Sequence, residues 1–139
     1  MKEYIVLVCG FIGGIVSTIL GGWNHLMTTL VFAMGVDFAT GLIVAGVFKQ
    51  SKKTEHGALE SNTGFKGLAK KGTMILIVLI AHRLDLAIGT GTNIVRDSVI
   101  IGFVVNELIS VIENVGLMGV WVPPVLKKAI EVLKEKENK

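Results

Sequence analysis

The feature that most limits the fold is a long stretch with almost no charge. From Tyr4 to Phe48 the chain carries one formal charge, Asp37. Only 18% of all residues are charged, whereas soluble domains carry about 25%. Most of the other charges gather in two regions, with six lysines and two glutamates in 49–72 and eight charged residues in 127–139. This pattern is typical of a membrane protein, and it argues against a nucleic-acid partner because the lysines flank apolar segments.

Four apolar segments predict an all-α, multi-pass transmembrane protein, with 1–139 as a single membrane domain. The expected parts are the apolar segments 4–20, 23–48, 73–88 and 98–115, the basic loop 49–72 and the charged amphipathic tail 125–139. The first segment would be roughly 26 Å long as a helix, against a hydrocarbon core of about 30 Å. The glycines at 21 and 22 interrupt the helix between the first two segments, which predicts a helical hairpin. The third and fourth segments are short and charged, so three or four spans are expected.

The lysines favour four spans. With four, both termini and the basic loop lie on the same side, which the excess of positive charge predicts to be the cytoplasm. With three, the two basic regions would face opposite sides. The lysines therefore predict a membrane protein with both termini and the basic loop in the cytoplasm.

Small residues recur at helical spacing in the first two segments. Gly10 and Gly14 are four apart, and Gly41 and Ala45 repeat that spacing. Such pairs let membrane helices approach closely. We expect these residues to pack helices together, either within one subunit or between subunits of a homo-oligomer.

The fourth segment carries a polar stripe. At about 100° per residue, its polar residues fall within an arc of roughly 120°. They are Asn106, Glu107, Ser110, Glu113 and Asn114. Carboxylates inside a membrane face a bundle interior or water. The stripe could line an aqueous pore, form a subunit interface, or face water from a helix lying on the membrane surface.

Three further charged residues lie in the apolar segments: Asp37, Arg83 and Asp85. Together with Glu107 and Glu113, they set four carboxylates against one arginine. Some carboxylates must therefore be protonated or reach water. Asp37 is either a hydrogen-bonded helix contact or a site whose protonation or pairing biases assembly.

No constellation for catalysis or metal binding is visible in the sequence. The three histidines lie on separate segments without metal-ligand spacing, and no phosphate-binding glycine motif is present. We expect no enzyme, no cofactor and no metal site.

The chain resembles the phage-lysis and toxin-secretion holins, small multi-pass proteins of phages and Gram-positive bacteria. The resemblance covers about 21–133 and rests on blocks in a fixed order. Matching residues are Gly21, Gly22, Trp23, Asp37, Phe38, Thr40, Gly41, Ser61, Gly64, Gly67, Leu68, Lys70, Lys71, Asp85, Arg96, Asn106, Glu107, Ser110, Glu113, Asn114, Gly119, Pro124, Leu126 and Lys127. Phe38 departs from the tyrosine that is usual in the second block.

The resemblance implies a holin. Such a protein oligomerises in the lipid bilayer and opens timed lesions that release a murein hydrolase or a large protein toxin. Two other readings stay open. A small ion channel or transporter could use the intramembrane carboxylates, and a membrane scaffold could recruit partners without conducting.

Overall fold

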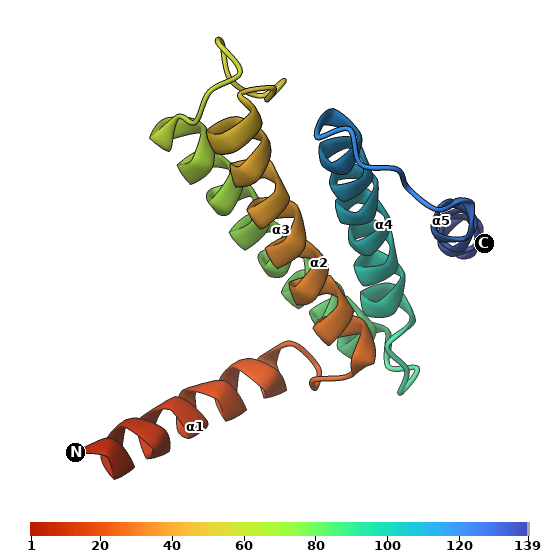
Figure 1. Cartoon of the computed structure of the whole chain (residues 1–139). Helices are drawn as coiled ribbons and strands as arrows, with labels where there is room; N and C mark the ends of the chain where they lie inside the picture. Colours follow the sequence, from red (N-terminus) through yellow and green to blue (C-terminus); the bar gives the residue numbers. More distant parts are fainter. Residues whose placement is uncertain (139) are drawn as a thin grey trace.

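The computed structural model describes residues 1–138 and contains helices and no strands over that part of the chain. The five α-helices are α1 (Lys2–Ile19), α2 (His25–Ile43), α3 (Ser61–Ile88), α4 (Ile94–Leu117) and α5 (Pro124–Glu137). A π-helical turn, Val44–Phe48, extends α2. Helices α2, α3 and α4 form a bundle, α1 projects from one end, and α5 lies beside α4 (Figure 1). The all-α prediction is confirmed.

The turn between α1 and α2 forms where the glycine pair predicts a break. Gly21 and Gly22 have φ angles of +85° and +93°, which side chains disfavour. A Cβ on Gly21 would also stand 2.4 Å from the Nδ1 of His82 on α3. After the turn, the Asn24 side chain accepts a hydrogen bond from the Met27 N–H at 3.1 Å and caps α2.

Helix α1 projects away from the bundle. None of its side chains is buried, and in Figure 1 it points away from the other helices. Its side chains are apolar almost all round the helix, from Tyr4 to Ile19. An apolar surface of this extent marks contact with a membrane or another protein.

Helix α3 begins earlier than the sequence suggested. It starts at Ser61 rather than at residue 73, so the region expected as a basic loop, 49–72, is a loop only as far as residue 60. Lysine, leucine and alanine are good helix formers. The positive charge of the lysines alone does not end a helix. With 28 residues, α3 is roughly 42 Å long, which exceeds the hydrocarbon thickness.

The core of the bundle lies where α2, α3 and α4 meet. It consists of large aliphatic and methionine side chains from these helices and the turn before α2. These are Leu20, Met27, Leu30, Met34, Met74, Val78, Ile100 and Val104. Helix α4 is the central element because it contacts α2, α3 and α5.

Within residues 1–138, three helices are long and apolar enough to cross a membrane: α1, α2 with its π-helical extension, and α4. The fourth span favoured by the charge pattern, at 73–88, is not confirmed. That part of α3 is short and contains Arg83 and Asp85, while the rest of the helix is rich in lysine.

The charged tail forms α5 and packs on α4 through a narrow apolar face. Ile130 is buried, and Leu133 packs against the core of the bundle. Near the end of α5, the Glu137 carboxylate lies close to Gly102 of α4. The tail is thus an amphipathic helix whose charged side faces outward.

Candidate functional site

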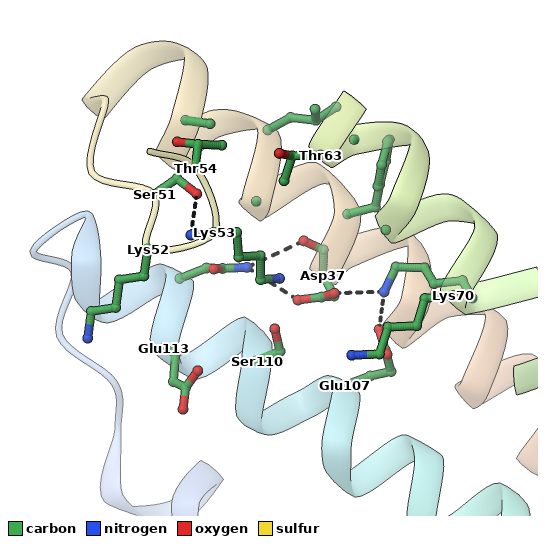
Figure 2. A pocket seen from close by; sticks show the side chains of 18 of the residues that line it. Asp37, Ser51, Lys52, Lys53, Thr54, Thr63, Lys70, Glu107, Ser110 and Glu113 are labelled. Carbon is green, nitrogen blue, oxygen red and sulfur yellow. Dashed lines mark hydrogen bonds and ion pairs between the residues drawn. The ribbon is translucent and has the colours of Figure 1, made fainter. Parts of the chain in front are cut away.

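A buried ion cluster links the three helices of the bundle. The Lys71 ammonium of α3 lies 2.7 Å from the Oδ2 of Asp37 on α2 and also pairs with the Glu107 carboxylate on α4. Asp37 and Glu107 are only 6% and 4% exposed. Figure 2 shows these interactions as dashed lines between the three helices. We call Asp37, Lys71 and Glu107 the charge triad.

Asn114 of α4 extends the triad toward the end of the bundle that carries the 49–60 loop. Its amide donates to the Asp37 Oδ1 at 3.3 Å and to the Thr40 hydroxyl at 3.0 Å. A Cβ on Gly41 would stand 3.8 Å from this amide. A larger residue there would extend toward Asn114, so the small residue keeps α2 and α4 close at this contact.

The triad carries an excess negative charge if all three members are ionised. Lys71 supplies one positive charge to the two carboxylates, and the Asn114 amide donates a further hydrogen bond to Asp37. Buried charges are tolerated when they are paired and hydrogen-bonded. The triad and Asn114 therefore allow otherwise apolar helices to pack around ionic groups.

A cavity of about 190 Å³ opens beside the triad, between α2, α3, α4 and the loop 49–60. All five polar residues of the predicted stripe line it. They do not share one environment: Glu107 and Asn114 are buried, Ser110 is half-buried, and Asn106 and Glu113 are exposed. One part of the stripe is thus buried and hydrogen-bonded within the subunit, and the other part is exposed.

A second cluster of charged residues, Asp85 and Arg96, stabilises the turns at the opposite end of the bundle. The Asp85 carboxylate accepts hydrogen bonds from the N–H groups of Val95 and Arg96 at 2.9 and 2.8 Å. It therefore caps α4 from the neighbouring helix. Arg96 is fully buried, and its guanidinium donates to the Gly22 carbonyl at 2.8 Å. Arg83, in contrast, is exposed on α3.

Replacing Asp85 should loosen this end of the bundle. Asp85→Ala removes both hydrogen bonds to the first turn of α4 and a negative charge near the positive end of its dipole. We expect a loss of about 1–2 kcal/mol in the free energy of unfolding. Thermal unfolding in detergent measures it, with Arg83→Ala on the same helix as the control. Equal effects of the two changes would contradict the capping role.

The small-residue pairs have different surroundings. Gly41 and Ala45 lie inside the bundle, where both line the cavity. Gly10 and Gly14 lie on α1, and a Cβ on either glycine would meet no atom of another element within 4 Å. The first pair therefore lies between helices of the same chain, whereas the second pair has no such contact within the described residues.

Two cations inside the bundle, one half-buried and one fully buried, are not evident from the sequence alone. Lys71 falls within the region expected as a basic loop, and Arg96 falls in the turn before the fourth segment. Lys71 pairs with Asp37 and Glu107, and the backbone N–H of Arg96 donates to Asp85, so each lies beside a carboxylate that the sequence places in the membrane. The Arg96 guanidinium itself pairs with Asp97 at 3.4 Å. The signal that could have found them is the imbalance of charge in the apolar segments.

Comparison with known proteins places the chain in a family. The sequence profile of the bacteriophage holin family matches residues 14–135. An uncharacterized protein of Listeria monocytogenes is 39% identical, covering 94% of this chain and 86% of its own. A relative from Listeria innocua is 38% identical, over 96% and 91% of the two chains.

A more distant relative carries a functional name. The protein named probable holin of Bacillus phage phi105 is 26% identical, covering 74% of this chain and 69% of its own. No solved structure matches the chain. The region that matches the family profile, residues 14–135, contains the charge triad, Asn114 and the cap at Asp85. The chain described here belongs to the bacteriophage holin family.

Proposed function

We propose that the protein is a holin, which oligomerises in the bacterial cytoplasmic membrane and opens timed lesions. These lesions release a murein hydrolase and lyse the host cell, or they release a large protein toxin. Family membership supports the role. The observation that carries the proposal is a set of apolar, span-length helices that store polar and charged groups between them.

The closed subunit hides part of the α4 stripe. Glu107 and Asn114 are held by partners on α2 and α3, so they need no water. Asn106 and Glu113 remain exposed and can pair with another subunit or meet water. When subunits assemble into a lesion, we propose that α4 turns its whole stripe toward the opening or its subunit interface. Carboxylates facing lipid would cost about 2.5–3.5 kcal/mol each, so the stripe favours a water-filled opening.

We propose that α3 crosses the membrane with its neighbours. It packs against α4, and Lys71 reaches carboxylates near the middle of α2 and α4. Because Lys71 contacts α2 and α4 near their middles, the part of α3 around Lys71 lies within the membrane if α2 and α4 span it. With α1 also crossing, both termini and the loop 49–60 face the cytoplasm, as the positive charge favours.

A channel would differ from a holin in the size of what it releases. The polar cavity beside the triad also fits a small ion channel or transporter, so the two functions need a direct comparison. The protein is reconstituted into vesicles that hold a small dye and a folded enzyme of hydrolase size. We expect both to escape together. Escape of the dye alone would indicate a channel, and retention of both would indicate a scaffold.

Asp37 should set the time of lysis. Asp37→Asn keeps the side-chain shape, leaves Lys71 paired with Glu107 and removes the excess negative charge of the triad. The closed subunit should gain stability, so lysis should start later after induction. Optical density recorded through induction measures this delay, with Glu131→Gln, at an exposed position on α5, as a control outside the triad. An unchanged lysis time would contradict the role of Asp37.

A further inference from the structure

The cavity beside the triad offers free hydrogen-bond donors. Its carboxylates are largely engaged: Lys71 and Asn114 occupy the two oxygens of Asp37, and Lys71 also holds Glu107. Glu60 accepts from the Thr63 hydroxyl at 3.3 Å. Three of the four acids that line this cavity are therefore already hydrogen-bonded, and the fourth, Glu113, is exposed.

Three lysines that line the cavity, Lys52, Lys53 and Lys70, have no acidic partner in the described part of the chain, and two of them point toward the triad or α4. Lys53 comes from the loop and Lys70 from α3, and neither forms an ion pair among residues 1–138. Figure 2 shows the Lys53 side chain directed toward Asp37, and the Lys70 side chain directed toward α4. The Glu113 carboxylate points away from Asp37 in the same view.

A buried hydroxyl adds a third donor. The Thr54 Oγ1 is shielded from solvent and has no hydrogen-bond partner within the described residues. Thr54 lines the same cavity as the two lysines. A buried polar atom without a partner costs free energy, and a ligand oxygen in the cavity would remove that cost.

The walls around these donors are apolar. Phe38, Leu42, Leu59 and Leu117 line the cavity, and Leu42 and Leu59 are exposed at its edge. Two ammonium groups and a hydroxyl fit a phosphate oxyanion. The apolar edge fits the start of an acyl chain, and basic pockets between membrane helices bind lipid headgroups in this way.

We propose that this cavity binds the phosphate of an anionic phospholipid from the cytoplasmic leaflet. Lys53, Lys70 and the Thr54 hydroxyl hold the phosphate, and the leucines at the edge contact the acyl chains. The proposal needs the protein to lie in a membrane but does not need it to open lesions. A lipid-binding test and a lysis test can therefore fail separately.

Native mass spectrometry of the full-length protein tests the proposal. The protein, in a neutral detergent, is titrated with phosphatidylglycerol or with phosphatidylcholine, and bound lipid is counted. The test variant is Lys53→Gln with Lys70→Gln. The matched control is Lys66→Gln with Lys127→Gln, which removes equal charge from exposed sites outside the cavity. Thr54→Val, which changes one hydroxyl to a methyl group, provides a second variant.

We expect the wild type and the control to prefer phosphatidylglycerol, and the test variant to bind it about 30-fold more weakly. Thr54→Val should weaken binding in the same direction. Displacement of the lipid by inorganic phosphate would support recognition through the phosphate group. Binding of phosphate without preference for phosphatidylglycerol would overturn the lipid assignment. Equal loss in the test and control variants would overturn the site.

Discussion

Lys71→Met should destabilise the subunit more than any other single change in the bundle. It leaves Asp37 and Glu107 close together without a cation, in a site where both are nearly fully buried. Removal of one partner from a buried ion pair costs about 3–5 kcal/mol. We expect the variant to unfold at a much lower temperature in detergent and to accumulate poorly in the membrane.

The neighbouring lysines provide the controls for this result. Lys66→Met removes the same charge from an exposed position on α3, and it should have little effect. Adding Asp37→Asn and Glu107→Gln to Lys71→Met should restore part of the stability because no buried charge is then left unpaired. If Lys71→Met and Lys66→Met behave alike, the triad does not hold the bundle together.

Replacing both glutamates of α4 should abolish permeabilisation while the protein still inserts. In Glu107→Leu with Glu113→Leu, Lys71 keeps Asp37 as its partner, so the closed bundle retains a neutral ion pair. The other change lies at an exposed position. The polar stripe, however, loses both of its carboxylates. An α4 without them gains much less free energy from facing water, so the closed arrangement should persist.

Membrane fractionation and the loss of membrane potential after induction measure the two parts of this prediction. The variant should reach the membrane in wild-type amount and leave the potential intact. Ile109→Leu, an exposed apolar change on the same helix, should leave lysis normal. Normal lysis by the double leucine variant would show that the stripe does not line the opening or its interface.

Much of the architecture could be predicted from local signals. A nearly uncharged stretch predicts membrane helices, and the paired glycines mark the turn where α1 ends. The polar stripe is visible because helical periodicity is a local property of α4. Family resemblance also depends on short blocks of residues, which the sequence contains in order.

The pairing inside the bundle depends on contacts distant in sequence. Lys71 lies 34 residues from Asp37 and 36 from Glu107, and no local pattern joins them. A lysine near a basic loop is ordinarily solvated, so its charge suggested a loop where the chain is helical. Arg96 and Gly22 meet across an even longer separation. The imbalance of charge in the apolar segments predicts that some carboxylates are protonated or reach water, and it could not identify the cations that pair with them.

We expect the protein to open lesions that pass a folded enzyme. Induced expression in a bacterium tests it most directly, with the protein alone or together with a murein hydrolase that lacks an export signal. Membrane potential and optical density are followed through induction. We predict sudden loss of potential in both cultures and rapid lysis only where the hydrolase is present. Loss of potential without lysis in the presence of the hydrolase, or no change in either reading with the protein confirmed in the membrane, would contradict the claim.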